Sequence, residues 1–465
     1  MCENGLVTKT NLRDPNFGTK LVHAGHNPAE WTYNDVVPPI SMSTIFNLRS
    51  PGVIEGFEYT RCGNPIRSVL EKCLIALDHA EYALVYSSGM AAISSMVNLL
   101  APGDHILCSS NVYGGTYRLL NKIAKQAGIL FDFIDFSETA TIIKNIKPNT
   151  KLVWFESLSN PLMIVLDVQE VAEAVHRTRA DIVVAVDNSF VTPYFQFLGI
   201  GWSVLGGSSY MAHTASSKGQ RFVMVFREAS PCLSCLNSST WFTLHVVDLY
   251  LRLRPLDLGV DVIMYSLSKY MNGHSDIIMG SLVTNKKDLY DKLYVFQYTS
   301  GNVSSPFDCY MVNRGLKTLH VRMEQHMKNA TEVALYLESH PKVLKVNYTG
   351  LPSHQQSEII KKQFTGHNGI VSFYINGDIE VSTKLLESLK LFCITCSLGC
   401  YESLAALPCK MTHASLTNEE RQSTGIHDNL IRLSIGLEYY QDLIDDLEQA
   451  IQASGANDKC YEPNS

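Results

Sequence analysis

From about residue 63 the sequence alternates between two patterns, and this alternation restricts the fold more than any other feature. Short apolar segments at 82–88, 105–110, 131–136, 151–157, 181–188 and 262–268 have the length of β-strands. Amphipathic segments with a helical period lie between some of them, at 89–100, 117–128 and 167–178. Continuously apolar strands that alternate with helices predict an α/β fold whose mostly parallel central sheet is covered on both faces.

The pattern changes after about residue 320. An amphipathic helix at 321–340 precedes strands at 342–348, 369–375 and 430–437 and helices at 380–392 and 440–454. We therefore expect a large α/β domain over 63–320 and a smaller α+β domain over 321–465 that ends in a disordered tail. Residues 1–62 are irregular and are typical of an extended arm. Residues 197–253 also lack a period and form an atypical insertion in the large domain.

Composition and charge exclude several classes of function. The chain of 465 residues has a net charge of −7, which disfavours binding to nucleic acid or to an anionic membrane surface. The sequence has no apolar run long enough to span a bilayer and no apolar segment of a secretory signal near residue 1. Twelve cysteines without such a signal indicate reduced thiols and a cytoplasmic protein.

Two cysteine pairs have the spacing of zinc ligands, Cys232 with Cys235 and Cys393 with Cys396. The pairs lie far apart in the sequence, and neither sits in a short glycine-rich turn. We therefore interpret them as incidental thiols and expect no metal, although a zinc-binding protein remains an alternative.

Lys269 stands at the end of the predicted strand 262–268, next to the hydroxyls of Ser266 and Ser268 and before a Gly-His-Ser turn. Burying an ammonium group lowers its pKa, and the resulting neutral amine is a nucleophile that forms Schiff bases with aldehydes. For an isolated lysine, a side chain that reaches the surface or pairs with an acid would be the simpler interpretation.

Three further features lie at predicted strand ends. Gly89 and Met90 begin a helix after a strand, where backbone N–H groups bind phosphate, although the same junction also suits an ordinary helix cap. Asp187 ends the strand 181–188 and should face the ligand crevice, where a carboxylate can hold a pyridinium nitrogen protonated. Tyr113 precedes two glycines, and its ring could stack on a cofactor. Together with Lys269 these features describe a pyridoxal 5'-phosphate (PLP) site.

With these residues in view, the chain resembles the Cys/Met-metabolism family of PLP-dependent enzymes over about residues 18–196 and 254–452. "GFEYTR", "KYMNGHSD" and "MTHAS" are worded as in the animal cystathionine γ-lyases of that family. The resemblance implies the PLP-dependent transferase-like fold, known as fold type I. The segments that carry it are "FEYTRCGNP" (57–65), "SSGMAA" (87–92), "VYGGTYR" (112–118), "VDNSFVTPYFQ" (186–196), "SLSKYMNGHSD" (266–276), "NRGLKTLHVRMEQH" (313–326), "ESLAALPCKMTHAS" (402–415) and "LIRLSIGLE" (430–438).

The resemblance implies catalytic roles for Lys269, which would hold the cofactor and carry protons, and for Tyr113, which would stack on the ring and help to transfer protons. It also implies that Asp187 pairs with the pyridinium nitrogen. The other implied cofactor-binding residues are Asn160 at the phenolic oxygen, Gly89, Met90, Ser266 and Ser268 at the phosphate, and Tyr59 and Arg61 at the phosphate of a neighbouring subunit. The implied substrate-binding residues are Arg432, as a clamp for the α-carboxylate, Ser397 beside it, Arg61 and Tyr113.

The implied reaction cleaves L-cystathionine to L-cysteine, 2-oxobutanoate and ammonia, with hydrogen sulfide as a possible product from cysteine or homocysteine. The implied assembly is a homotetramer of two active dimers. Several positions depart from the family pattern: Leu158, Leu267, Ser268, Cys396 and Cys400. Cys396 stands where these γ-lyases carry a glutamate, so methionine γ-lyase, cystathionine γ-synthase and cystathionine β-lyase activities remain open. An inactive paralogue or a gene-model variant also remains open because of the insertion 197–253.

Overall fold

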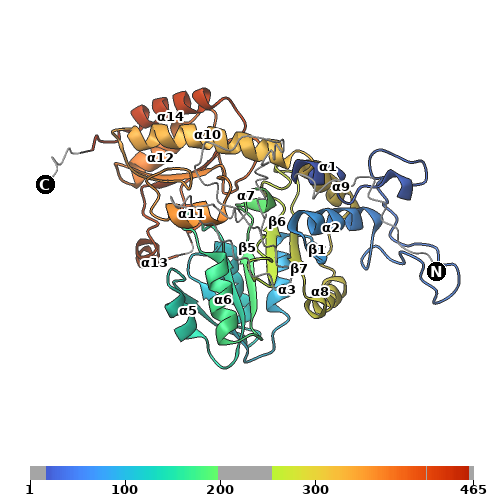
Figure 1. Cartoon of the computed structure of the whole chain (residues 1–465). Helices are drawn as coiled ribbons and strands as arrows, with labels where there is room; N and C mark the ends of the chain where they lie inside the picture. The colour runs from blue at the N-terminus through green and yellow to red at the C-terminus, as the bar shows by residue number, and fades with distance from the viewer. Residues whose placement is uncertain (1–16, 197–253, 415, 460–465) are drawn as a thin grey trace, which may run out of the picture.

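The computed structural model describes residues 17–196, 254–414 and 416–459, and these contain two β-sheets (Figure 1). The seven-stranded sheet has the order β1-β7-β6-β5-β4-β2-β3. Its strands are β1 (Tyr82–Tyr86), β2 (His105–Ser109), β3 (Leu130–Ile134), β4 (Thr150–Glu156), β5 (Val183–Asp187), β6 (Val262–Ser266) and β7 (Gly280–Thr284).

The larger sheet is mostly parallel, as the sequence predicts. Strands β2 to β6 pair in parallel, whereas β7 runs antiparallel to both of its neighbours, β1 and β6. The sequence pattern missed β7, which begins at a glycine and lies in an otherwise irregular stretch. The predicted helix 117–128 is also divided, into α4 (Gly114–Arg118) and a π-helical turn over Leu119–Ala124.

Helices cover both faces of this sheet, which explains why its strands are apolar without alternation. On one face Val153, Val184 and Ile263 pack in a core shared with α2 (Pro65–Asp78), α6 (Val168–Thr178) and α9 (Pro306–Leu316). On the other face Trp154 and Met264 pack in a core shared with α3 (Gly89–Val97) and α8 (Lys287–Ser300).

The second sheet has five strands in the order β10-β11-β12-β9-β8. They are β8 (Val343–Asn347), β9 (Ile370–Ile375), β10 (Cys393–Ile394), β11 (Leu404–Ala406) and β12 (Leu430–Ser434). Figure 1 shows α10 (Leu319–Ser339), α12 (Ile379–Ser388) and α14 (Tyr440–Ser454) stacked over this smaller sheet. The remaining helices are α1 (Phe17–His23), a 3₁₀-helix (Pro28–Glu30), α5 (Thr139–Asn145), α7 (Thr192–Phe195), α11 (Ser357–Gln363) and α13 (Asn418–Ser423).

The large sheet is continuous across the two ends of segment 197–253, which itself lies outside the described residues. Ala185 of β5 pairs with Val262 of β6 in parallel register. Arg254, which is buried, donates to the carbonyl oxygens of Pro193 and, at 3.1 Å, of Gln196. The chain therefore leaves and re-enters the fold at neighbouring points, so the insertion does not disturb the sheet.

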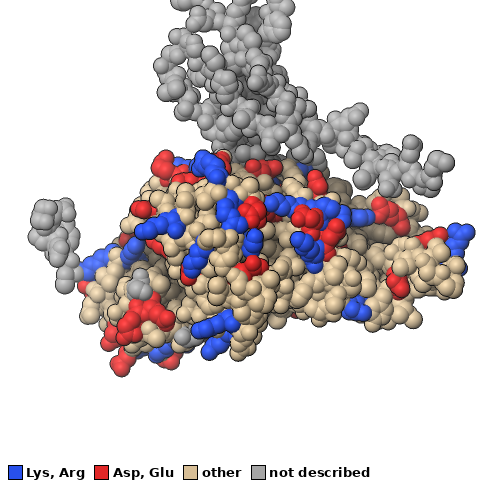
Figure 2. Space-filling model, turned by 90° about the horizontal axis from the view of Figure 1, so that it is seen from below, with Lys and Arg blue, Asp and Glu red and all other residues tan. Residues whose placement is uncertain are grey.

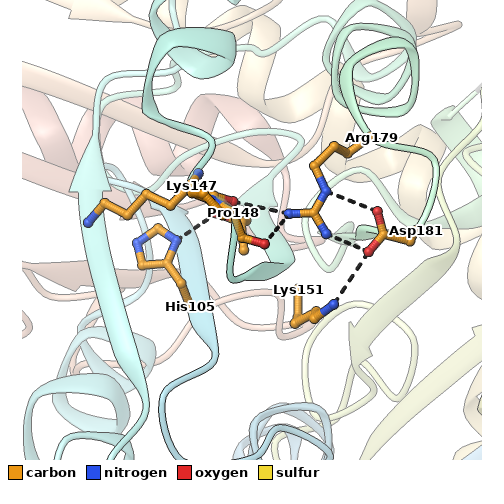
Figure 3. A network of polar contacts seen from close by, with 7 residues as sticks. His105, Lys147, Pro148, Lys151, Arg179 and Asp181 are labelled. Atoms are coloured by element: carbon orange, nitrogen blue, oxygen red, sulfur yellow. Dashed lines mark hydrogen bonds and ion pairs between the residues drawn. The ribbon is translucent and has the colours of Figure 1, made fainter.

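The amino ends of the strands are closed by charged side chains and main-chain carbonyls (Figure 3). Arg179 donates to the Pro148 carbonyl at 2.6 Å and pairs with Asp181 at 2.5 Å, and Lys151 reaches the same carboxylate at 3.4 Å. His105 is buried nearby and bonds to Thr150 at 2.9 Å. These contacts join the starts of β2, β4 and β5 at the amino edge of the sheet.

On the face shown in Figure 2, basic and acidic side chains are intermixed rather than separated. In the part of the chain that the structure describes, no helix is both long and apolar enough to cross a bilayer.

Candidate active site

Lys269 lies just beyond the carboxyl end of β6. Its Nζ donates to the Ser397 hydroxyl at 3.1 Å, and its main-chain N–H donates to the Ser266 carbonyl at 3.1 Å. Burial lowers the pKa of the Lys269 amine, the charge of Arg432 lowers it further, and Cys396 and Asp187 oppose the fall. The amine can therefore lose its proton more easily than an exposed lysine can.

Asp187 ends β5, next to β6 in the sheet. Its Oδ1 accepts two hydrogen bonds from Ser189, at 3.0 Å from the main-chain nitrogen and at 2.6 Å from the hydroxyl. Burial raises the pKa of the Asp187 carboxyl, while the Ser189 bonds and the charge of Lys269 act in the opposite direction. The structure thus places a carboxylate with a cationic neighbour at the sheet edge where the sequence predicts it.

Glu156 is a buried carboxyl group that the sequence analysis missed. It ends β4 directly opposite Asp187 and accepts the main-chain N–H of Tyr113 at 2.5 Å. Burial, and then the charge of Asp187, raise its pKa well above the usual range. Burial also raises the pKa of Asp187, but the Ser189 bonds and the Lys269 charge oppose that rise, so Asp187 is the more readily ionised carboxyl of the pair. The signal was present, because the segment 151–157 ends on this glutamate at the same edge as Asp187.

The start of α3 meets the end of β6 at Gly89. A Cβ atom on Gly89 would lie 3.0 Å from Met264 Cε and 3.3 Å from Ser266 Oγ, so a larger residue would crowd this approach. Ser88 caps the helix by accepting from the Ala91 N–H at 3.0 Å. The N–H groups of Gly89 and Met90 have no partner within the helix because they belong to its first turn. The structure therefore brings Gly89, Met90 and Ser266 together in a cradle suited to an anion.

Ser268, the fourth predicted phosphate ligand, has a local partner instead. Its hydroxyl donates to the Met279 carbonyl at 3.2 Å and accepts from the Met279 N–H at 2.8 Å. The hydroxyl fastens the Lys269 turn to the segment before β7, and a role in phosphate binding stays a prediction.

Arg432 lies in the middle of β12 and is only 1% exposed. Its guanidinium donates to the Ser397 carbonyl at 2.7 Å and to Asn160 Oδ1 at 3.4 Å. Its Nε is buried without a hydrogen-bond partner, and no carboxylate of the described chain lies within ion-pair distance of it. Burial lowers the pKa of Arg432 to about 10. An uncompensated guanidinium next to Lys269 and Ser397 is a receptor for a carboxylate.

Three predicted site residues, Tyr113, Tyr59 and Arg61, make their contacts away from Lys269 within this chain. Tyr113 is 46% exposed, and its ring lies over Gly115, where a Cβ atom would be 2.3 Å from the ring. The Arg61 guanidinium lies 5.3 Å from the centre of the Tyr59 ring and donates to the Tyr298 carbonyl at 2.6 Å. These contacts do not bring Tyr59 or Arg61 to Lys269, Asp187 or Gly89, so their predicted role depends on a second copy of the chain and stays a prediction.

Comparison with known proteins identifies the framework that holds these residues. The family model for Cys/Met metabolism PLP-dependent enzymes matches residues 18–204 and 248–452. The chain belongs to this family. Pyridoxal 5'-phosphate is therefore its cofactor, and it is a PLP-dependent enzyme. The family match leaves residues 205–247 uncovered, and these lie inside the predicted insertion 197–253, whose bounds stay a prediction.

Several curated proteins that are similar to this chain are named cystathionine γ-lyase. Human cystathionine γ-lyase is 44% identical over 94% of each chain, and the putative cystathionine γ-lyase 2 of Caenorhabditis elegans is 43% identical over 94% of this chain and 97% of that one. The crystal structure of cystathionine γ-lyase from yeast superposes with a TM-score of 0.80 and 34% identity, covering 96% of this chain and all of that chain. The predicted fold type I architecture is confirmed.

A cavity of about 160 Å³ adjoins Asn160 in this member of the family. Tyr117, Phe133 and His413 are among its lining residues. Burial and the charges of Arg432 and Arg118 lower the pKa of His413 to about 4, so this histidine is neutral near pH 7. Sequence reasoning did not single out His413, because nothing in "MTHAS" indicates that it lies near Arg432.

The zinc alternative can be examined for one of its two pairs only. Cys393 and Cys396 are exposed free thiols, whereas Cys232 and Cys235 lie outside the described residues. In the ranges 17–196, 254–414 and 416–459, no three His, Cys, Asp or Glu side chains are grouped as metal ligands.

Proposed function

We propose that the protein cleaves L-cystathionine to L-cysteine, 2-oxobutanoate and ammonia. The names of the relatives support this substrate, and one observation carries the proposal within the chain. Arg432 is a buried guanidinium without an anionic partner, and it shares Ser397 with the amine of Lys269. An amino acid that placed its carboxylate on Arg432 would bring its α-carbon close to Lys269.

The residues present fit PLP on two independent grounds. The glycine-dependent approach of α3 to β6 forms a phosphate cradle that a Cβ atom on Gly89 would obstruct. Asp187, half-buried at the end of β5, would hold a pyridinium nitrogen in its protonated form. When bound, PLP supplies an electron sink for the electrons released at the substrate α-carbon.

The side chains would then divide the remaining work. Lys269 removes the proton from the α-carbon and then one from the β-carbon, and Ser397 holds its amine in position. Arg432, oriented by Asn160, binds the α-carboxylate. Tyr113 stacks on the cofactor ring, and its phenol or the Lys269 ammonium protonates the departing γ-sulfur. Protonation at sulfur releases cysteine as a thiol rather than as a less favourable thiolate.

The presence of a cysteine at position 396 favours a second candidate function. Cys396 precedes Ser397, which bonds to both Lys269 and Arg432, and it stands where the resemblance places a glutamate that binds the distal ammonium of cystathionine. A thiol does not bind an ammonium as a carboxylate does. A related activity, as a methionine γ-lyase, cystathionine γ-synthase or cystathionine β-lyase, is the alternative, and release of hydrogen sulfide from cysteine or homocysteine is a further reaction that the same site could perform.

The proposed assembly is a homotetramer in the cytoplasm. Exposed apolar side chains in the arm before α2, among them Tyr33, Val36, Met42, Ile45 and Tyr59, support a partner surface there. Figure 1 shows this arm reaching out beside α2 and α9. We propose that it carries Tyr59 and Arg61 to the phosphate of a neighbouring subunit, and we retain the division into 1–62, 63–320 and 321–465 as part of the proposal.

Purified, PLP-loaded protein tests the function directly. We expect turnover of cystathionine, little turnover of methionine or O-acylhomoserine, and a yellow absorbance that is absent in Lys269→Ala. Borohydride followed by peptide mapping should mark Lys269. Lys317→Ala is the matched control, because burial also lowers the pKa of Lys317, and this variant should stay yellow. Turnover of methionine or O-acylhomoserine without turnover of cystathionine would replace the first candidate by the second.

A further inference from the structure

The turn that joins the arm to α2 is held to the body of the chain by its main-chain carbonyl groups. Arg67, in the first turn of α2, donates to the carbonyl oxygens of Thr60 at 2.7 Å and Arg61 at 3.3 Å. Tyr294, on α8, donates through its hydroxyl to the next carbonyl oxygen, that of Cys62, at 2.8 Å. Two side chains to which the proposed reaction assigns no role therefore fix three consecutive carbonyl groups of this turn.

Both of these side chains are fixed by their own surroundings. Arg67 is only 3% exposed. The Tyr294 ring lies between the rings of Tyr290 and Tyr298, whose centroids are 6.0 Å and 5.2 Å away. These three tyrosines recur every four residues, so they share one face of α8. Gln297 of the same helix donates to a main-chain carbonyl of β1 at 2.8 Å, so α8 connects the turn to the large sheet.

The side chains of the turn reach the surface, whereas its main chain is held from within. Tyr59 is 40% exposed, and the guanidinium of Arg61, which is also exposed, lies 5.3 Å from the centre of the Tyr59 ring. Arg61 also donates to the Tyr298 carbonyl at 2.6 Å. A turn whose main chain is already ordered presents its side chains in one geometry and loses less conformational entropy when a partner binds. We therefore interpret the turn as a preformed contact surface.

We propose that Arg67 and Tyr294 are positioning residues that act on the neighbouring subunit. They hold the turn in the geometry in which Tyr59 and Arg61 reach the phosphate of PLP in that subunit. This inference rests on the proposed assembly. It adds that a change at Arg67 or Tyr294 weakens PLP binding in the neighbouring site, whereas the altered subunit's own Lys269 site stays intact beside an unaltered neighbour. A purely structural role would instead weaken the site of the subunit that carries the change.

Tyr294→Phe is the mildest test, because it keeps the ring contacts and removes only the hydroxyl. Loss of this one hydrogen bond should raise the Kd for PLP about fivefold, and Arg67→Met/Tyr294→Phe, which loses three, should raise it about tenfold or more. Tyr290→Phe is the matched control, because its ring lies in the same row and its hydroxyl makes no hydrogen bond within the described residues. Titration with PLP, followed by the yellow absorbance, measures each Kd, and Tm shows that each variant is folded. A Kd of Tyr294→Phe equal to that of Tyr290→Phe would overturn the proposal.

Hybrid oligomers show on which subunit the turn acts. The double variant Arg67→Met/Tyr294→Phe is co-expressed with an excess of Lys269→Ala chains, so that most of its chains have a Lys269→Ala neighbour. Each remaining Lys269 then meets an unaltered turn, and we expect yellow sites with the wild-type Kd for PLP, which neither parent protein forms.

Two results of this experiment contradict the proposal. Yellow sites that all keep the weak Kd of the double variant would show that the turn acts within its own subunit, and a monomeric wild type would remove the neighbour altogether. Failure of the wild type to cleave cystathionine would refute the proposed function alone, because both readouts measure PLP binding.

Discussion

Replacing Arg432 by methionine removes the charge of the carboxylate receptor and keeps most of the side-chain length. Burial lowers the pKa of this guanidinium from 12.5 to about 10. The charged form is therefore disfavoured in the folded protein by about 3 kcal/mol, and this applies at every pH below about 10. The variant loses the bonds to Ser397 and Asn160, at about 1 kcal/mol each. The folded protein should thus be about as stable as the wild type, or slightly more stable.

The catalytic activity of Arg432→Met, unlike its stability, should fall strongly. Loss of a buried, hydrogen-bonded contact with a charged group costs about 2–5 kcal/mol, which corresponds to a fall of roughly 30- to 5,000-fold in kcat/KM for cystathionine. Arg432→Lys keeps the charge but loses the planar guanidinium, so its kcat/KM should lie between those of the wild type and Arg432→Met. Differential scanning fluorimetry and steady-state kinetics of the PLP-loaded variants measure both quantities.

Arg322→Met is the matched control. Burial lowers the pKa of Arg322 to about 10 as well, but its guanidinium donates to the carbonyls of Tyr270, Met271 and Gly315. Arg322 also donates to the Thr318 hydroxyl at 3.1 Å, so Arg322→Met loses four hydrogen bonds where Arg432→Met loses two. Because relief of burial is the same for both, Arg322→Met should melt below Arg432→Met. If Arg432→Met lost as much Tm as Arg322→Met and no more kcat/KM, Arg432 would be a structural cation, and the reasoning about a carboxylate receptor would be refuted.

Three further outcomes follow from described contacts. Asp187→Asn should lower kcat about 10²-fold or more and weaken the yellow absorbance, whereas Glu156→Gln should stay within a few-fold of the wild type because burial raises the pKa of Glu156 and favours its neutral form. Equal losses in kinetic assays would contradict this assignment. Burial raises the pKa of Glu71 from 4.5 to about 7, so the wild type loses up to about 3 kcal/mol of stability as pH rises between these values. Glu71→Gln should therefore melt above the wild type at pH 8 and together with it at pH 5, and a gap of equal size at both pH values would exclude burial of the charge as its cause. Deleting 205–247 should leave a folded, yellow enzyme, since the family match resumes on both sides and Arg254 already bonds to Gln196; a shortened chain that could not bind PLP, tested beside full-length protein that does, would show that the insertion is needed.

The sequence alone determined the parallel part of the large sheet and the edge on which its polar groups gather. Both follow from short-range patterns, because strand period and length show which segments are buried, and the carboxyl ends of parallel strands share one edge. This is why Lys269, Asp187 and Gly89 could be assigned before any coordinates were known. It is also why Glu156, at the end of a recognised strand, could have been found by the same rule.

Tertiary structure alone decided which of these groups meet and in which state of protonation. Lys269 and Ser397 are 128 positions apart, and Asn160 and Arg432 are 272 apart, so their contacts arise only where the second sheet packs against the first. The same packing removes Arg432 from water. Within the large domain, the chain between β6 and β7 gives Ser268 a partner in Met279, 11 positions away. A sequence pattern records whether a residue prefers burial, but it does not record which distant residue will be buried beside it, and the charges of this site depend on those neighbours.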